Sequence, residues 1–348
     1  MTSEVGQLKY NRVLTMSDAA PLRDEGAAAV DAPDRRDGRV YVYNEELQLA
    51  VEVALATGRP LLLLGEPGVG KSSFAAFVAR NWKARYYEYV VTARTQANDF
   101  LWSYDSVRRL SDAQMRKPGD PPLDDFRYVR PGVLWWGIDR ASAFRRGAPE
   151  TVDVDSSARE PFAEMNEVRL PERAVVLVDE IDKADPDVPN DLLVALGSLE
   201  FEVHETGQLV RRPVRHSKED ERPDVSQLLV IITTNEEREL PAAFMRRCVV
   251  HELRHPGIEA LVDIARRHTQ QGGGVFEAEA EQLCKEIAKK LAELREEAEA
   301  LRVRPPGTAE FLDAVRACRG LEIDPTSPTW PEVERVVLRK SRELGASL

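Results

Sequence analysis

The chain has 348 residues, of which 43% are hydrophobic, and its formal net charge is −12. That length can form a full α/β core and a second, smaller domain, while the acidic balance disfavours non-specific attraction to nucleic acid. No apolar run approaches the ~20 residues of a membrane span, and the N-terminus lacks the basic-then-apolar layout of a secretory signal. The three cysteines are far apart and lack zinc-site spacing. We therefore expect a cytoplasmic protein with reduced, mostly buried thiols and no membrane segment.

The N-terminal segment differs in composition from the rest of the chain. Residues 1–38 show no sustained periodicity, and DAPDRRDG at 31–38 has the composition of a solvated linker, so we expect a flexible leader. Asn44 is suited to cap a helix that begins at Glu45 and stops at Gly58.

Apolar runs at 61–64, 174–178 and 228–233 predict buried strands, and 86–91 and 248–253 are weaker candidates. Strands buried on both faces and alternating with helices predict a doubly wound parallel sheet, sandwiched by helices, over residues 39–253.

In residues 254–348 the apolar residues recur at helical spacing, which predicts a smaller helical domain. Within it, residues 277–302 show an apolar stripe and a charged face. This stretch is a coiled-coil partner helix or, as we favour, an ordinary domain helix with a solvated face.

A glycine-rich turn comes after the first apolar strand and fits the pattern G-x-x-x-x-G-K-[ST] without departure. Glycines let backbone N–H groups turn inward on phosphates, the lysine reaches the β- and γ-phosphate oxygens, and the next serine can ligate Mg²⁺. The helix that begins at the lysine adds its positive N-terminal end. The predicted nucleotide-binding residues are Gly65, Glu66, Pro67, Gly68, Val69, Gly70, Lys71, Ser72 and Ser73.

A phosphate-binding loop needs a carboxylate on a neighbouring strand to hold the metal. Asp179 follows the apolar run 174–178 and is predicted to bind Mg²⁺ together with Ser72. Glu180 is then placed to polarise the attacking water, which favours hydrolysis over transfer to a second substrate. Asp182 and Lys183 are expected to cap and pair locally.

Polar residues follow the run 228–233. Asn235 is expected at the carboxyl edge of the sheet, where it can orient the attacking water. Arg246 and Arg247 lie just beyond. Paired arginines beside an apolar helix usually form surface ion pairs, but in a nucleotide-binding chain one of them can reach a neighbouring subunit's phosphate as an arginine finger.

These segments together resemble AAA+ ATPases, specifically the MoxR-like branch. The resemblance covers most of the chain from Val40 and is carried by GRPLLLLGEPGVGKSSFA, WSYDSVRRLSDAQ, YVRPGVLWWG, VVLVDEIDKADPDVPNDLL, FEVHETGQLV, VIITTNEERELPAAFMRRC and RPPGTAEFLDAV.

The resemblance implies roles for single residues. Lys71 and Ser72 match Walker A, Asp179 and Glu180 match Walker B, and Asn235 matches sensor 1. Arg247 matches the arginine finger, with Arg246 as its alternative. Residues 201–215 match the hairpin before sensor 1, joined near 206–207, and residues 94–136 hold the family's insertion around the second helix.

One position departs from the AAA+ pattern. Many members place a sensor 2 arginine at the start of the third helix of the C-terminal lid domain, whereas Glu310 stands there in this chain. Arg304 or Arg302 is the candidate substitute for contact with the nucleotide.

The resemblance implies an ATPase that uses ATP and Mg²⁺ in a hexameric ring and acts on a protein partner, such as one with a von Willebrand factor A domain. A finger supplied by a neighbour requires such an oligomer. Two alternatives remain: a nucleic-acid motor resembling McrB, with a channel lined by Arg211, Arg212 and Arg215 and by Arg108 and Arg109, or a nucleotide-gated scaffold with little hydrolysis. Glu180 argues against the scaffold. The acidic charge and the lack of a recognised DNA-binding module argue against the motor.

Overall fold

The structure is a computed structural model that describes Arg12, Leu14, Met16 and residues 38–151, 157–213 and 226–339. Most of the expected leader therefore lies outside the described residues, as do Arg215 and part of the acidic stretch 151–167. Leu14 is buried, and its N–H donates to Oε1 of Glu52 at 2.9 Å. That part of the expected leader is thus attached to the first helix rather than free.

The described chain divides into two compact units. The first comprises residues 44–64 and 78–251, and the second comprises residues 38–43, 65–77 and 252–339. The first unit contains the sheets, and the second contains the phosphate-binding loop and the C-terminal helices.

A five-stranded sheet forms the centre of the first unit, with the strand order β2-β5-β8-β1-β9. The pairs β2–β5, β5–β8 and β8–β1 are parallel. The strands are β1 (Leu61–Leu64), β2 (Ala84–Val90), β5 (Leu170–Asp179), β8 (Leu228–Thr233) and β9 (Val249–Glu252). All five strands that the sequence predicted are therefore present, and the parallel sheet is confirmed.

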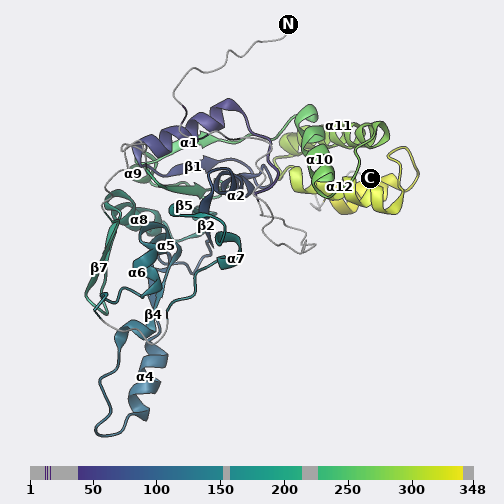
Figure 1. The fold of residues 1–348 in the computed structure, drawn as a ribbon. Helices are drawn as coiled ribbons and strands as arrows, with labels where there is room; N and C mark the ends of the chain where they lie inside the picture. The colour runs from purple at the N-terminus through teal and green to yellow at the C-terminus, as the bar shows by residue number, and fades with distance from the viewer. Residues whose placement is uncertain are drawn as a thin grey trace. The chain divides into compact units, whose positions relative to one another are not determined.

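Both faces of the central strands are buried, which explains their uniformly apolar sequences. Val176 and Ile232 face a core that contains Trp135, whereas Val175 and Ile231 point to the opposite face and are equally buried. Helix α1 (Glu45–Thr57) packs on β1 and β8, and α5 (Val133–Ile138) packs on β2 and β5 (Figure 1).

Helix α1 begins and ends where the sequence predicted. The side chain of Asn44 accepts a hydrogen bond from the N–H of Leu47, and Gly58 adopts the left-handed conformation with φ +64°. The remaining helices of this unit are α3 (Ala97–Leu101), α4 (Ser106–Met115), α6 (Arg140–Phe144), α7 (Ala163–Asn166), α8 (Asp187–Ser198) and α9 (Ala242–Met245). Helix α2 (Lys71–Asn81) runs from the second unit into the first.

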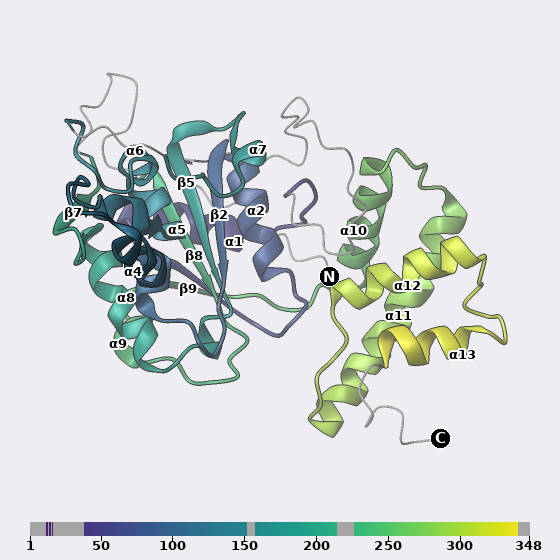
Figure 2. The same cartoon turned by 90° about the horizontal axis from the view of Figure 1, so that it is seen from below.

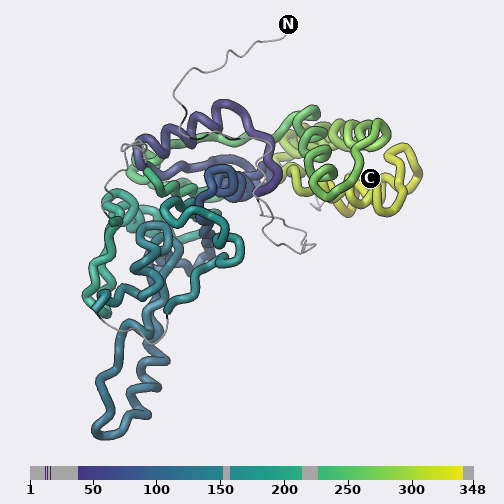
Figure 3. The backbone as a smooth tube through the Cα atoms, viewed as in Figure 1, coloured from purple at the N-terminus to yellow at the C-terminus, as the bar shows by residue number. Residues whose placement is uncertain are grey.

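Two short hairpins complete the first unit. Strands β3 (Trp102–Tyr104) and β4 (Val129–Pro131) are antiparallel and enclose α4, which projects away from the sheet (Figure 3). Strands β6 (Glu200–Val203) and β7 (Gln208–Arg211) form the predicted hairpin, with a turn at 204–207.

The second unit has a helical core. Its helices are α10 (Ile258–Gln271), α11 (Ala278–Leu301), α12 (Thr308–Leu321) and α13 (Trp330–Val333), which Figure 2 shows grouped together. The α11 residues Ile287, Leu291 and Leu294 pack against Phe311 and Val315 of α12. Helix α11 is therefore an ordinary domain helix whose apolar stripe is covered within this chain, as favoured over the coiled-coil alternative.

No helix within the described ranges is long and apolar enough to cross a membrane.

Candidate active site

The phosphate-binding loop joins the end of β1 to the start of α2 and requires glycine at specific places. Gly65 and Gly68 have φ values of +142° and +85°, which side-chain-bearing residues rarely adopt. A Cβ on Gly65 would lie 2.4 Å from the carbonyl oxygen of Leu253, and one on Gly68 would lie 3.1 Å from Cα of Gly307. Backbone conformation and close neighbours therefore both demand glycine, as expected for a loop that wraps closely around a ligand.

Lys71 is the first residue of α2 and lies over this loop. Its Nζ donates to the carbonyl oxygens of Gly65 and Glu66, at 2.5 and 2.9 Å. The ammonium is buried, so these acceptors offset the loss of water around the charge. Ser72 follows in the first turn, where helix N–H groups point outward and favour an anion. The predicted binding residues between Gly65 and Ser73 thus form one continuous loop and helix start.

Glu66 of the loop pairs with a histidine from the C-terminal segment. Its Oε2 lies 2.8 Å from Nε2 of His255. The pKa of His255 is lowered, first by burial and then by the nearby guanidinium of Arg295, while Glu66 opposes the shift. The sequence predicted no role for His255.

Both arginines that could substitute for sensor 2 have exposed side chains. Arg302 ends α11 in the left-handed conformation and is exposed, as is Arg304. Glu310, which stands in the usual arginine position, caps α12 instead: its Oε2 accepts from the N–H of Gly307 at 3.0 Å. A carboxylate serves this purpose because the first N–H groups of a helix lack intrahelical partners.

Arg295 interacts electrostatically with Glu66 of the loop, and sequence analysis predicted no role for it. Its Nε and Nη1 donate to the carbonyl oxygens of Pro306 and Pro256, both at 2.9 Å. Its Nη2 is buried and has no hydrogen-bond partner among the described residues, and burial lowers its pKa to about 10 despite the opposing charges of Glu66 and Glu310. Its position next to the buried Leu294 was the available signal, because both lie near the core face of α11.

Two neighbouring strands of the first unit end in polar residues that contact one another. Asp179 is the last residue of β5, and Thr233 is the last residue of β8. The hydroxyl of Thr233 donates to Oδ1 of Asp179 at 2.7 Å, and both residues are buried. The parallel pairing of β5 and β8 brings these carboxyl ends side by side, as the sequence-based prediction required.

Glu180 and Asn235 meet at the same edge of the sheet. The backbone N–H of Glu180 donates to Oγ1 of Thr233 at 2.8 Å, and Nδ2 of Asn235 donates to Oε1 of Glu180 at 3.1 Å. The N–H of Asn235 donates in turn to Oδ2 of the buried Asp182 at 3.1 Å. The polar residues at these two strand ends therefore form one hydrogen-bonded cluster.

The candidate finger residues lie at the end of α9. Arg246 and Arg247 are both exposed, and the carbonyl oxygen of Arg246 accepts from Nη1 of Arg59 at 3.2 Å. Both arginines therefore lie at the surface of the first unit.

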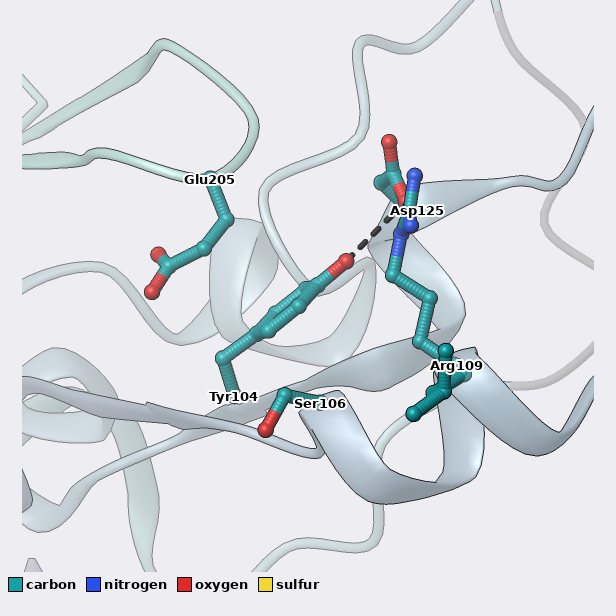
Figure 4. A pocket seen from close by; sticks show the side chains of 6 residues that line it. Tyr104, Ser106, Arg109, Asp125 and Glu205 are labelled. Atoms are coloured by element: carbon teal, nitrogen blue, oxygen red, sulfur yellow. Dashed lines mark hydrogen bonds and ion pairs between the residues drawn. The ribbon is translucent and has the colours of Figure 1, made fainter. Parts of the chain in front are cut away.

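A hollow of about 420 Å³ lies between the inserted segment and the turn that joins β6 and β7 (Figure 4). The side chains of Tyr104, Ser106, Arg109, Leu110, Asp125 and Glu205 line it. Nε of Arg109 lies 2.5 Å from Oδ1 of Asp125, and the hydroxyl of Tyr104 donates to the same oxygen at 3.0 Å. None of the predicted catalytic or nucleotide-binding residues lines this hollow.

The donor set suits Mg²⁺ bound together with a nucleotide. Ser72 offers a hydroxyl and Asp179 a carboxylate, both hard oxygen donors of the kind that Mg²⁺ prefers. No group of three or more histidine, cysteine or acidic side chains among the described residues could hold a metal ion without other ligands. Mg²⁺ is usually held by one or two carboxylates plus substrate phosphates, so one carboxylate such as that of Asp179 is enough on the protein side.

The five-stranded parallel sheet, the phosphate-binding loop after β1 and the acidic end of β5 define an AAA+ P-loop fold with additional C-terminal helices. The chain belongs to the AAA domain family (dynein-related subfamily), whose model matches residues 60–248, more than half of the 348 residues.

Two solved structures are similar to this chain at low sequence identity and low TM-score. A point mutant of RuvB from Thermotoga maritima is 14% identical, with 83% of this chain and 74% of that chain covered and a TM-score of 0.41. A presumed ATPase of Cytophaga hutchinsonii is also 14% identical, with 89% and 87% covered and a TM-score of 0.40. A comparison with curated proteins gives no match.

Proposed function

We propose that this chain is a MoxR-like AAA+ ATPase that hydrolyses ATP in an oligomeric ring, here a hexamer, and so remodels or activates a partner protein. The observation that carries the proposal is the cluster of Asp179, Glu180, Thr233 and Asn235 at adjoining strand ends. A chain that only bound nucleotide would need the aspartate that holds the metal, but not a second carboxylate next to it. Here that second carboxylate, of Glu180, is held by the amide of Asn235 after the next strand.

The proposal assigns ATP phosphates to the loop from Gly65 to Ser73, with Lys71 on the β- and γ-phosphate oxygens. Ser72 and Asp179 would hold Mg²⁺, which when bound neutralises negative charge on the phosphates. The helical unit from residue 254 onward would act as the lid of the nucleotide site. Within it we propose Arg304, or Arg302, as the nucleotide contact that replaces sensor 2; both side chains are exposed.

Hydrolysis transfers the γ-phosphoryl group to water. The oxygen of a water molecule forms a bond to the γ-phosphorus, and the bond to the β–γ bridging oxygen breaks with its electron pair leaving on ADP. The carboxylate of Glu180 accepts the proton of that water, and the amide of Asn235 fixes the carboxylate through its 3.1 Å hydrogen bond. Arg247, or Arg246, would stabilise the charge on the phosphate of a neighbouring subunit.

The nucleic-acid alternative has weaker support. Arg109, one of its proposed contacts, pairs with Asp125, and neighbouring Arg130 pairs with Asp105 at 2.5 Å. Arginines that already pair with carboxylates of the same chain add little attraction for the phosphate backbone of a nucleic acid. Arg215, another proposed contact, lies outside the described residues. We therefore favour a protein partner.

A substrate trap tests the proposed function. Tagged Glu180→Gln is expected to bind ATP, hydrolyse it poorly and retain its client in lysate, with Lys71→Ala as the empty-site control. Mass spectrometry should then show one protein enriched only with Glu180→Gln and ATP. Enrichment of a von Willebrand factor A domain protein would support the specific partner. Recovery of nucleic acid, or of this chain alone, would contradict the proposed protein client.

A further inference from the structure

The phosphate-binding loop carries a carboxylate of the same sign as its proposed ligand. Glu66 is the second residue of this loop and directly precedes Pro67. Loops of this kind bind phosphates through backbone N–H groups that turn inward, so the space that they enclose favours an anion. A carboxylate that entered this space would compete for those N–H groups and would repel the phosphates of ATP. The position in which the Glu66 carboxylate is held therefore affects how well the loop can bind a nucleotide.

Glu66 is fixed at two points within the second unit. Its carbonyl oxygen accepts a hydrogen bond from Nζ of Lys71 at 2.9 Å. Its side chain reaches His255, which lies between β9 and α10, with 2.8 Å between Oε2 and Nε2. The backbone of Glu66 thus contacts the lysine that is assigned to the phosphates, whereas its charge is directed to the C-terminal segment.

The ring of His255 makes a single hydrogen bond among the described residues, and that bond goes to Glu66. Nδ1 of the ring is buried and has no partner in the part of the chain that the structure describes. The pKa of His255 is lowered, first by burial and then by the charge of Arg295, which favours the neutral imidazole. A neutral imidazole donates from one nitrogen only, so Nε2 carries the proton and donates it to the carboxylate.

The charge of Arg295 acts on the same carboxylate. Its guanidinium is fixed by hydrogen bonds to the carbonyl oxygens of Pro306 and of Pro256, which directly follows His255. The charge of Glu66 raises the pKa of Arg295, against the larger effect of burial. Because opposite charges attract, the guanidinium stabilises the carboxylate in this position. The C-terminal segment therefore offers Glu66 both a hydrogen-bond donor and a positive charge.

We propose that His255 is a positioning residue that holds the carboxylate of Glu66 away from the phosphates and so keeps the loop able to bind ATP. This inference rests on the proposed ATP site, but it depends neither on hydrolysis nor on a protein client. The Glu66 side chain is 55% exposed, so it has room to move once its donor is removed. The freed carboxylate would then compete with the phosphates for the N–H groups of the loop.

The first expected effect is on the dissociation constant for ATP. His255→Leu keeps a side chain of similar size but has no donor, and it should weaken ATP binding by about three- to tenfold. Glu66→Asp keeps the charge but is too short to reach His255, so it should weaken binding to a similar extent. His255→Gln retains a donor and should bind ATP more nearly like the wild type.

The response to salt separates repulsion from a structural defect. Dissolved ions screen the interaction between partly exposed charges, so the loss in His255→Leu should shrink as KCl rises from about 0.05 M to about 0.5 M. A misplaced loop would bind ATP poorly at both concentrations. The matched control is Arg254→Ala, which removes the neighbouring exposed residue and its ion pair with Glu252. It should bind ATP like the wild type.

A double-mutant cycle tests whether His255 acts through Glu66. Glu66→Gln removes the charge and should bind ATP at least as tightly as the wild type, because no carboxylate remains to repel the phosphates. In that background, the further change His255→Leu should alter the dissociation constant by less than about twofold. The effect of His255→Leu thus depends on the presence of the carboxylate.

The experiment measures binding of ATP with Mg²⁺ by isothermal titration calorimetry at the two salt concentrations, with thermal unfolding as the test of folding. Weaker, salt-sensitive binding by His255→Leu and Glu66→Asp, but not by the double variant or by Arg254→Ala, would support the inference. Wild-type binding by either folded variant, or an equal loss for His255→Leu in both backgrounds, would overturn it and leave the ATPase proposal intact. Absence of ATP binding by the wild type would overturn both.

Discussion

The hydroxyl of Thr233 connects the two acidic residues at the end of β5. It donates to Oδ1 of Asp179 at 2.7 Å and accepts from the N–H of Glu180 at 2.8 Å. One fully buried side chain on β8 thus fixes both the proposed metal ligand and the proposed base. The arrangement explains why a threonine ends an otherwise apolar strand.

The first prediction concerns this hydroxyl. Thr233→Val keeps the shape but leaves a buried N–H and a carboxylate oxygen without this partner, which should destabilise the protein by about 1–3 kcal/mol. Thr233→Val removes the acceptor for the backbone N–H of Glu180, so the carboxylate of Glu180 is held less firmly in place. We therefore expect kcat to fall about tenfold. Steady-state ATPase assays and thermal unfolding measure both effects.

Thr206→Val is the matched control for this substitution. Thr206 lies in the turn between β6 and β7, where its hydroxyl makes a local hydrogen bond to Val203. It should leave kcat near the wild-type value. Equal kcat for Thr233→Val and Thr206→Val would show that the hydroxyl on β8 does not position the site.

The second prediction concerns the core of the helical unit. Leu291 of α11 is fully buried, whereas Leu301 at the end of the same helix is 47% exposed. Leu291→Ala should therefore lower the free energy of unfolding of this unit by about 2–5 kcal/mol. Leu301→Ala should change it by no more than about 0.5 kcal/mol. Urea unfolding followed by circular dichroism compares them, and similar midpoints would contradict the assigned orientation of α11.

The third prediction concerns thiol reactivity. All three cysteines are free and buried. Burial raises the pKa of Cys248 to about 12 and that of Cys284 to about 11. The thiolate is the reactive form, so a higher pKa means less thiolate at any pH below it.

Ellman's reagent at pH 8 should therefore react with the native protein far more slowly than with the protein in guanidinium chloride, where all three thiols should titrate. Raising the pH of the native sample toward 9 should produce only a small increase. Rapid modification of even one thiol under native conditions would contradict the described packing.

The strands were predictable because their sequences satisfy a simple physical requirement. Residues 61–64 and 228–233 were predicted as strands and form β1 and β8 with those bounds, since a strand buried on both faces must be apolar throughout. The loop from Gly65 was equally recognisable, because its glycines and the lysine and serine after them form one short contiguous sequence pattern.

Long-range and turn-dependent features were not predictable in the same way. Lys183 was expected to pair locally, and it does so with Glu180, three residues earlier. Asp182 was also expected to pair locally, but its Oδ2 accepts from the N–H groups of Asn235 and Glu237, which follow β8 far along the chain. Arg295 was overlooked because a charged residue in a charged helix is usually solvated, and its partners Pro256 and Pro306 are distant in sequence.

Lys71 is proposed to bind ATP, and Glu180 is proposed to be needed for its hydrolysis. The most direct measurement compares ATP binding and phosphate release for the wild type, Lys71→Ala and Glu180→Gln, with Lys289→Ala as a control at an exposed lysine of α11. Glu180→Gln should bind ATP like the wild type and release phosphate at least ~100-fold more slowly, because it lacks the base. Lys71→Ala should lose binding and turnover together, and Lys289→Ala should match the wild type. Wild-type phosphate release by Glu180→Gln would contradict the account.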